Sequence, residues 1–443
     1  MIWYNNCITA RSPARQIKGI RMTTAFTKTS TIFKTMFRAL QYRNFRLFWF
    51  GQCISLTGTW MQRTAQTWLV YTVTKSPMLV GIVGVCQFMP MLLFSLFAGV
   101  LVDRFSKKKI LILTQLIFML QAVLMTLLTY TGQIQYWHIL VLSTLFGFTQ
   151  TLDMPARQSF FIDLVGAENL TNAISLNSTI VNLARIVGPA VSGIVMLKYG
   201  MVFCFLVNAL SFIPVIVGIL LIQVKENPAH RSRSHMLPDI LDGIRYIKKN
   251  DTLILNVLIT AVVCTFAMNN DVIIPVFAKE VLGRGADGYT ALLSTAGFGA
   301  FLGAITMAYF SKNGVKKGIL LFSGTITALL QVLTLAAGQY WVSIVLVAAI
   351  GFLNLIFMNI ANSIFQVNSS NEYRGRVMSV YAFLNLGSTP IGNFLSGFVM
   401  ERVGGWFGFV FCGVITLLLL TVIFVIKRHT VLDWLPKRSA AGT

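Results

Sequence analysis

Twelve long apolar stretches limit the fold of this chain more than any other feature of its sequence. The hydrocarbon core of a bilayer is about 30 Å thick, and a helix needs roughly 20 apolar residues to cross it. Backbone N–H and C=O groups find no water there, so each stretch must be an α-helix that pairs its backbone internally. The sequence therefore predicts an all-α integral membrane protein with twelve transmembrane helices. The stretches lie near 47–71, 79–101, 110–129, 137–154, 176–197, 201–223, 252–276, 289–310, 318–337, 341–361, 377–400 and 406–427.

The composition agrees with a surface that faces lipid. Hydrophobic residues make up 56% of the 443 residues and charged residues 11%, whereas a soluble globular protein carries roughly 25% charged residues. The six cysteines and four histidines show no spacing typical of metal ligands. No nucleophile–base set and no cofactor motif is visible. We therefore expect no metal, no cofactor and no enzymatic activity.

The basic residues are distributed unevenly between the two sides of the membrane. The chain has 36 Lys and Arg against 14 Asp and Glu, a balance that can indicate nucleic-acid binding. If the amino terminus is cytoplasmic, 29 of the 36 lie in cytoplasmic segments and five on the opposite side. Such a bias sets the orientation of membrane proteins. We therefore predict that both termini are cytoplasmic, and the basic balance needs no nucleic-acid partner.

The chain repeats itself. Glu168–Gly200 aligns without gaps with Glu372–Gly404, with Gly188 facing Gly392. The repeat predicts two six-helix halves, joined by a central loop whose segment 237–249 is typical of an amphipathic helix at the membrane surface. The expected parts are a basic cytoplasmic tail (1–46), an N-terminal bundle (47–223), a cytoplasmic central loop (224–251), a C-terminal bundle (252–427) and a cytoplasmic tail (428–443).

The segment between the second and third helices contains Gly99, Asp103, Arg104 and Lys107–Lys109. It resembles the signature cytoplasmic loop of the major facilitator superfamily, whose members have two such six-helix halves. The resemblance implies that Asp103 and Arg104 act at a gate and that Asp103 contacts the start of the eleventh helix in the outward-facing state. The alternative is a positively charged loop that only sets the topology.

On the other side of this gate, the contact is expected near Gly375–Met378, so we include Gly375 and Arg376 in it. The matching region of the second half, around Phe310, carries no Asp. That half is therefore expected to lack an equivalent contact.

A second set of residues resembles one subgroup of that superfamily. Asp153, Pro155 and Arg157 at the end of the fourth helix are similar to the exporters related to the bacterial enterobactin exporter, within the drug:proton antiporters. In the fifth helix, Gly188-Pro189 followed by Gly193 partly matches the antiporter motif. Proline bends a helix and glycine permits close packing. The resemblance implies export, and the alternative for the fifth helix is an ordinary kink.

Three charges lie well inside the membrane: Arg63, Arg185 and Asp271. A charge there needs a partner or a water-filled space. Arg63 and Asp271 lie at similar depth in helices 1 and 7, so we expect them to form a pair that closes the outer gate. The alternatives are a static pair and two solvated residues at the outer mouth of the protein. Arg185 is expected to contact an anionic substrate or to pair with Asp153. For Asp153 and Arg157 an ion pair at the inner gate and a static cap both stay open.

Two polar lines are candidates for the wall of a substrate cavity. Polar residues in helix 1 recur every three or four positions, which puts them on one face that a water-filled pathway would need. A second polar line runs along helix 10. The candidates are Gln52, Thr59, Gln62, Arg63 and Gln66 in helix 1, Arg185 in helix 5, and Asn354, Asn359 and Asn362 in helix 10.

The leading hypothesis is a secondary active transporter in a bacterial inner membrane that exports a small amphipathic molecule, such as a siderophore or drug, in exchange for protons. Coupling needs a carboxyl group that changes protonation during the cycle, and Asp271 is the first candidate and Asp153 the second. Uptake of a siderophore or other solute is the alternative. A receptor or scaffold that moves nothing is the third hypothesis. The superfamily resemblance implies a monomer.

Overall fold

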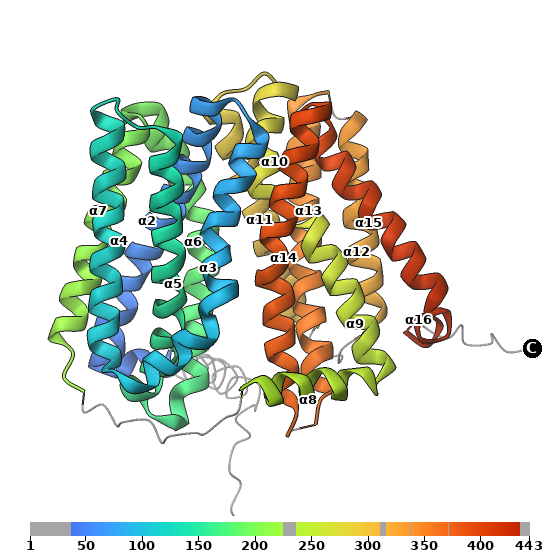
Figure 1. The fold of residues 1–443 in the computed structure, drawn as a ribbon, viewed down its shortest axis with the longest axis horizontal. Helices are drawn as coiled ribbons and strands as arrows, with labels where there is room; N and C mark the ends of the chain where they lie inside the picture. Colours follow the sequence, from blue (N-terminus) through green and yellow to red (C-terminus); the bar gives the residue numbers. More distant parts are fainter. Residues whose placement is uncertain (1–36, 225–235, 311–315, 337, 371, 435–443) are drawn as a thin grey trace, which may run out of the picture.

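The computed structural model describes residues 37–224, 236–310, 316–336, 338–370 and 372–434, and within them the chain is helical. Twelve long helical segments run between the two ends of the molecule (Figure 1). They are α2 (Arg43–Thr74), α3 (Pro77–Arg104), α4 (Lys107–Tyr130), α5 (Tyr136–Val165), α6 (Leu170–Tyr199), α7 (Met201–Leu221), the segment from α9 to η4 (Asp251–Val281), α11 (Ala286–Phe310), α12 with η6 (Gly318–Ala336), α13 (Tyr340–Val367), α14 (Arg374–Val403) and α15 (Phe407–Ile426).

Nine of these segments are apolar enough to span a membrane by length and composition, within the described residues. The other three, α2, α5 and α14, are 32, 30 and 30 residues long, which exceeds the roughly 20 residues that a bilayer requires. They are more polar because they carry side chains such as Arg63 and Asp153, which are directed into the protein. All twelve positions agree with the stretches expected from the sequence.

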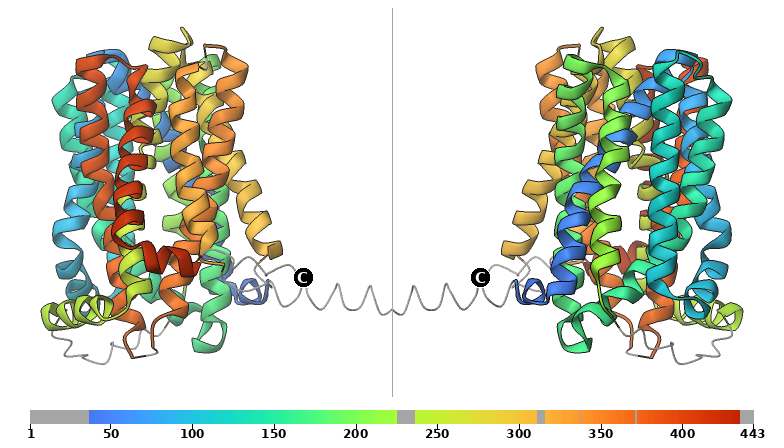
Figure 2. Two further views of the ribbon diagram at one scale, coloured as in Figure 1. Left: turned by 90° about the vertical axis from the view of Figure 1, so that its right-hand side faces the viewer. Right: turned by 90° about the vertical axis from the view of Figure 1, so that its left-hand side faces the viewer.

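Segments α2 to α7 come from the N-terminal half of the chain and the six segments from α9 to α15 from the C-terminal half (Figure 1). The amphipathic helix expected over 237–249 is α8 (Met236–Lys248), which lies across one end of the molecule, nearly perpendicular to the others (Figure 2). We call this the α8 end and the opposite one the far end. Tyr246 of α8 stacks on Tyr373 with ring centres 4.5 Å apart, which anchors α8 to the C-terminal half.

The seventh segment is broken, whereas the sequence predicted an uninterrupted helix over 252–276. It consists of α9 (Asp251–Val262), a π-helical turn η3 (Val263–Ala267), a short helix α10 (Asn270–Val276) and a second π-helical turn η4 (Phe277–Val281). The side chain of Asn269 donates to the carbonyl oxygens of Thr265 and Phe266, and so replaces backbone bonds lost at the break. Such interruptions are tolerated at membrane depth only where protein or water satisfies the backbone, and π-helical turns are frequent at functional sites.

The buried apolar residues show which end of the molecule is closed. Towards the far end, one continuous cluster joins both halves and includes Trp68, Tyr71, Ile274 and Tyr289. Towards the α8 end, the clusters are separate: one contains only residues of the C-terminal half and α8, and another only residues of the N-terminal half. The two halves are therefore packed together at the far end and apart at the α8 end.

The expected tails lie mostly outside the described residues. The first residues of the expected tail over 428–443 form a short helix, α16 (Arg428–Trp434), and Trp434 is buried against the C-terminal half. The tail over 1–46 ends in a 3-10 turn, η1 (Arg38–Gln41), before α2 begins at Arg43.

Small residues allow the closest approach between helices, and α11 and α13 show this most clearly. A Cβ atom at Gly351 would overlap the carbonyl oxygen of Ala296, and one at Gly299 would overlap that of Ala348. Helices in membranes associate through such contacts because lipid supplies no hydrophobic driving force between them.

We expect Gly351→Ala to push α11 and α13 apart and to destabilise the protein by about 1–3 kcal/mol, the usual cost of overpacking. The measurement is the thermal unfolding midpoint of the detergent-solubilised protein. Gly338→Ala is the matched control, because a Cβ atom at Gly338 meets nothing within 4 Å. Equal midpoints for the two variants would show that this contact does not limit the packing.

Candidate functional site

The residues Arg63 and Asp271 bring the two halves together at membrane depth. Arg63 Nη2 lies 2.5 Å from Asp271 Oδ2, which links α2 to α10. The expected pairing of these two residues is therefore present. The two side chains are 25% and 38% accessible, so water still reaches them. A small cavity of about 20 Å³ lies beside the pair, which is room for about one water molecule.

Further contacts between the halves surround this pair on the far-end side. The Tyr71 hydroxyl donates to Glu280 at 2.6 Å, and the ring of Trp68 stacks on Tyr289 with centres 5.4 Å apart. At the rim, Ser76 Oγ donates to Glu401 at 2.8 Å. The sequence analysis missed these contacts because nothing in the local sequence indicates which residues of α2 meet which residues of the opposite half.

Glycine in the expected helix-5 motif determines where Arg185 lies. A Cβ atom at Gly188 of α6 would overlap the Cβ atom of Trp60, so α6 and α2 approach closely at this level. The Trp60 ring thereby lies near two guanidinium groups, with its centre 5.2 Å from Arg185 Cζ and 5.1 Å from Arg63 Cζ. Cations at this distance from an indole ring are attracted to it. Arg185 therefore faces the space between the halves, near the Arg63–Asp271 pair.

Four polar residues of α6 continue from Arg185 towards the α8 end. They are spaced three or four residues apart, so they share one helix face with Arg185, and all are exposed. Thr179 beside them is also exposed. In contrast, Leu183 and Ile194 of α6 are exposed and apolar, which suits contact with lipid. The four residues are Thr171, Ser175, Ser178 and Asn182.

We call these four residues and Arg185 the α6 stripe. Its regular spacing was visible in the sequence, yet the sequence analysis singled out only Arg185. The stripe is a polar surface that leads from the α8 end, where the halves are apart, to the guanidinium of Arg185, which pairs with no carboxylate among the described residues.

Gln52 and Gln62 of the polar face of α2 are enclosed within the N-terminal half, which corrects the expectation for these two residues, whereas the buried Gln66 lines the cavity beside the Arg63–Asp271 pair. These three side chains are at most 8% accessible. Gln62 Nε2 donates to Gln121 at 2.8 Å, and Gln62 Oε1 accepts from Asn208 at 2.7 Å. These glutamines pair with polar residues of other helices inside the N-terminal half.

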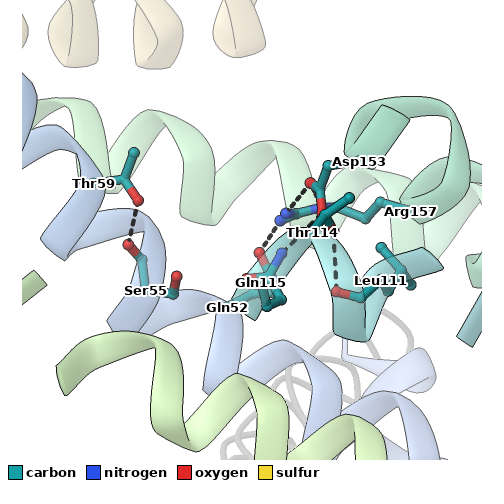
Figure 3. Close-up of polar contacts among 8 residues, drawn as sticks. All are labelled: Gln52, Ser55, Thr59, Leu111, Thr114, Gln115, Asp153 and Arg157. Carbon is teal, nitrogen blue, oxygen red and sulfur yellow. Dashed lines mark hydrogen bonds and ion pairs between the residues drawn. The ribbon is translucent and has the colours of Figure 1, made fainter. Parts of the chain in front are cut away.

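The remaining residues of that face fit the same picture. Gln66 Nε2 donates to Ser143 at 2.8 Å, which is again a contact within the N-terminal half. The hydroxyl of Thr59 donates back to the carbonyl oxygen of Ser55 in its own helix, and Thr59 is half-buried (Figure 3). Arg63, in contrast, forms an ion pair with the opposite half.

Asp153 is buried in a network within the N-terminal half (Figure 3). Its carboxylate pairs with Arg157 and accepts hydrogen bonds from Thr114 and Gln115, both at 2.8 Å. Arg157 also donates to Gln52 of α2. The predicted alternative that Arg185 pairs with Asp153 is wrong, because Arg157 occupies that carboxylate and Arg185 lies against Trp60.

The asparagines expected to line a pocket lie along α13. Asn359 is exposed, and Asn354 and Asn362 are half-buried. Asn354 Oδ1 is enclosed and accepts no hydrogen bond from the described residues, whereas Asn362 Oδ1 accepts one from Gln366.

A Cβ atom at Gly193, the last glycine of the helix-5 motif, would overlap Thr290 of α11, so this glycine also serves close packing between the halves.

The residues expected at the α8-end gate lie on both halves of the molecule. Arg104 is exposed and, with Lys109, lines a lateral cavity of about 740 Å³ along α3, α4 and α5. Gly375 is exposed, and a Cβ atom there would meet nothing within 4 Å. Arg376 lies 3.9 Å from Asp242 of α8. The side chain of Asp103 lies outside the described residues.

Comparison with known proteins identifies the family. Residues 34–439 match the family described as transmembrane secretion effectors. The chain belongs to this family of the major facilitator superfamily. It is therefore a multi-pass membrane transporter that handles small molecules, and not an enzyme.

Several relatives of this transporter are similar over most of its length. The staphyloferrin A transporter of Staphylococcus aureus is 24% identical, over 86% of this chain and 96% of the relative. The macrolide efflux protein A of Streptococcus pyogenes is 20% identical, over 89% and 99%. The enterobactin exporter of Escherichia coli is 23% identical, over 81% and 84%.

Solved structures agree on the fold of the transporter. A bacterial homologue of the human lysosomal transporter Spinster, in an inward-facing and unoccupied conformation, superposes with a TM-score of 0.67 at 13% identity, over 90% of this chain and 99% of that one. A POT family transporter superposes with a TM-score of 0.68 at 12% identity, over 87% and 96%. At this identity the likeness establishes the fold alone.

If the Arg63–Asp271 pair holds the far end closed, removing either charge should favour the open far end. We expect Asp271→Ala or Arg63→Ala to raise the labelling rate of a single cysteine at Thr67, which lines the cavity beside the pair, at least about fivefold, equivalent to about 1 kcal/mol. The measurement uses a membrane-impermeant maleimide in a cysteine-free background.

Two further variants control this experiment. Exchanging the charges (Arg63→Asp with Asp271→Arg) should return labelling towards the original rate. Asp251→Ala removes a carboxylate from an exposed pair with Lys427 and should leave it unchanged. A charge exchange that labels as fast as either single variant would argue against direct pairing.

The burial of Asp153 predicts a structural cost. Asp153→Ala leaves the half-buried Arg157 without its carboxylate partner and should destabilise the transporter by about 3 kcal/mol. The measurement is unfolding of the purified protein in mixed micelles, and Asp251→Ala should cost at most about 1 kcal/mol because its pair is exposed. If Asp153→Ala lowers the free energy of unfolding no more than the control variant does, the static cap has no support and the gating alternative is favoured.

Proposed function

We propose that this transporter exports a small amphipathic molecule, a siderophore or a drug, by alternating access. The observation that carries the proposal is the Arg63–Asp271 pair, because it joins the two halves at membrane depth. It must break when the far end opens, and an unpaired charge within the membrane costs several kcal/mol. Another charge, or a proton, can replace one partner. The pair can therefore link opening of the far end to binding of the cargo or of a proton.

The proposed orientation places the α8 end in the cytoplasm of a bacterium. It is supported by the excess of Lys and Arg in the segments at that end. The relatives reported above are all bacterial proteins. We accordingly propose a location in the bacterial inner membrane with both termini cytoplasmic, and a monomer that works as one unit of two halves.

Proton coupling is proposed to act through Asp271. A proton from the far side neutralises its carboxylate and so removes the attraction to Arg63, which opens the far end. Asp153 is the second candidate, but its contacts with Arg157, Thr114 and Gln115 all lie within the N-terminal half. A change in its protonation therefore has no direct contact through which to move the halves.

Gates at both ends complete the proposed cycle. Closing of the α8 end is assigned to Asp103 and Arg104 of the N-terminal half and to Gly375 and Arg376 of the C-terminal half. These two pairs of residues approach each other when the far end opens. Arg157 keeps its place in the network around Asp153. The exposed start of α14 at Gly375 supports this assignment, because it leaves room for a contact in the opposite conformation.

Export is favoured over uptake by two observations. Gly188 and Pro189 of α6 partly match the antiporter motif, and relatives include proteins called a macrolide efflux protein, a multidrug efflux pump and an enterobactin exporter. The name of the staphyloferrin A transporter gives no direction, so uptake remains the competing function that the following experiment separates.

Proton movement in everted membrane vesicles tests the proposal. With an acidic interior, siderophores and lipophilic dyes are added one at a time. We expect at least one of them to release the proton gradient in vesicles that contain the protein. Asp271→Asn should abolish this release because its side chain cannot take up and release a proton.

The control variant is Asp251→Asn, whose carboxylate lies on the surface in an exposed pair, and it should release the gradient as the original protein does. Full activity of Asp271→Asn against a gradient would exclude Asp271 as the proton carrier. If no compound releases the gradient while the purified protein still binds one, uptake or uncoupled transport becomes the better description.

A further inference from the structure

The space between the halves carries one positive charge that no described carboxylate neutralises. Arg63 is paired with Asp271, and Arg157 with Asp153. Arg185 forms no ion pair with any carboxylate in the described part of the chain, and its guanidinium lies over the ring of Trp60, which also lies near Arg63. Two cations and one anion thus meet near Trp60, which leaves one positive charge in excess.

The α6 stripe makes this charge accessible from the α8 end. Each of its members is exposed. The hydroxyl of Ser175 and the amide nitrogen of Asn182 donate to carbonyl oxygens one turn earlier in α6. In the conformation seen here, the side chain of Arg185 is exposed at the end of this polar surface.

Closing the α8 end would change the environment of Arg185. Alternating access requires a state in which both ends are closed around the bound molecule, and water is then largely excluded from Arg185. A cation without a partner in such a place is strongly disfavoured. A bound anion would remove this penalty, because a charge-assisted bond between a guanidinium and a carboxylate is strong and often bidentate.

We propose that Arg185 is the binding group for an anionic cargo, and that the molecules this transporter moves are small organic acids with a carboxylate at Arg185 and an apolar body in the space towards the C-terminal half. The proposal rests on the export function proposed above and specifies its substrate class. An empty transporter would close its α8 end with an unpaired Arg185, whereas a loaded one closes with this charge neutralised. The anion is therefore what permits the halves to move.

The sequence repeat supports placing this site on α6 alone. The residues of α14 that correspond to Asn182 and Arg185 are Leu386 and Thr389, so the C-terminal half supplies no matching charge. The cargo is therefore held at its charged end by the N-terminal half. A neutral or cationic drug would leave Arg185 unpaired and should be a poor substrate.

The test reads the local charge without requiring transport or proton coupling. A single cysteine replaces Asn182, one turn from Arg185, in a cysteine-free protein in detergent. Its labelling rates are measured with an anionic and a cationic methanethiosulfonate, the sulfonatoethyl and trimethylammonioethyl reagents. For each thiol, the rate with the anionic reagent is divided by the rate with the cationic one. We expect this ratio to be at least about tenfold higher for the cysteine at 182 than for a simple thiol, given the strength of bonds to charged groups. Arg185→Gln should abolish this preference, and Arg185→Lys should keep most of it.

Arg284→Gln is the matched control. Arg284 also lies over an aromatic ring, 4.8 Å from the centre of Tyr340, but at the far end of the molecule, so this variant should leave the preference unchanged. A second measurement uses 2-naphthoate and its neutral amide, 2-naphthamide, as competing ligands. Naphthoate should slow the labelling of the cysteine at 182, and the amide should not.

Equal labelling by the two reagents in the original protein, or a preference that survives Arg185→Gln, would overturn the proposal. So would equal protection by naphthoate and naphthamide, or protection by neither. Because none of these readouts depends on a gradient, they stand apart from the vesicle experiment. An anion-selective site in a protein that releases no proton gradient would refute coupled export and leave this inference intact.

Discussion

The requirement that every charge within a membrane meets a partner or water governs the arrangement of this transporter. Three arginines lie at membrane depth or near it, and each meets the requirement differently. Arg157 is matched by Asp153 within one half and Arg63 by Asp271 across both halves, whereas Arg185 lies over the Trp60 ring and is exposed. The first pair stabilises a half, the second links the halves, and the third is left for a ligand. The same physical cost thus has three consequences, which depend only on where the partner is located.

Glycine and the break in the seventh segment make these positions possible. Gly188 brings α2 so close to α6 that Trp60 lies beside Arg185. A Cβ atom at Gly392 of α14 would overlap the carbonyl oxygen of Thr265, directly beside the break at Asn269. The break starts α10 just before Asp271, in the middle of a segment that would otherwise be a regular helix. The charged site therefore depends on close backbone contacts, and the residues that supply them carry no charge.

The fold could be predicted from the sequence because lipid leaves few choices: long apolar stretches must be helices, and the repeat divides them into two halves. The Arg63–Asp271 pair could be predicted because both charges needed a partner at the same depth. The cavity wall could not be predicted, because a polar face can meet either water or another polar face. In α2 the face of Gln62 and Gln66 meets Gln121, Asn208 and Ser143. In α6 the equally regular stripe from Thr171 to Arg185 is exposed, and the sequence alone does not distinguish the two cases.

The duplication of the chain explains the overall symmetry but not the site. Both halves retain the small residues that allow close packing, such as Gly188 and Gly392, whereas the charged residues differ: the N-terminal half has Arg63 and Arg185 and the C-terminal half has Asp271. If both halves carried the same charge, the pair across the interface would be replaced by repulsion. If neither did, opening the far end would need no exchange of charge and could not be coupled to a proton or an anion. In the proposed mechanism, loss of symmetry at these positions is therefore what couples the movement of two similar halves to a proton or an anion.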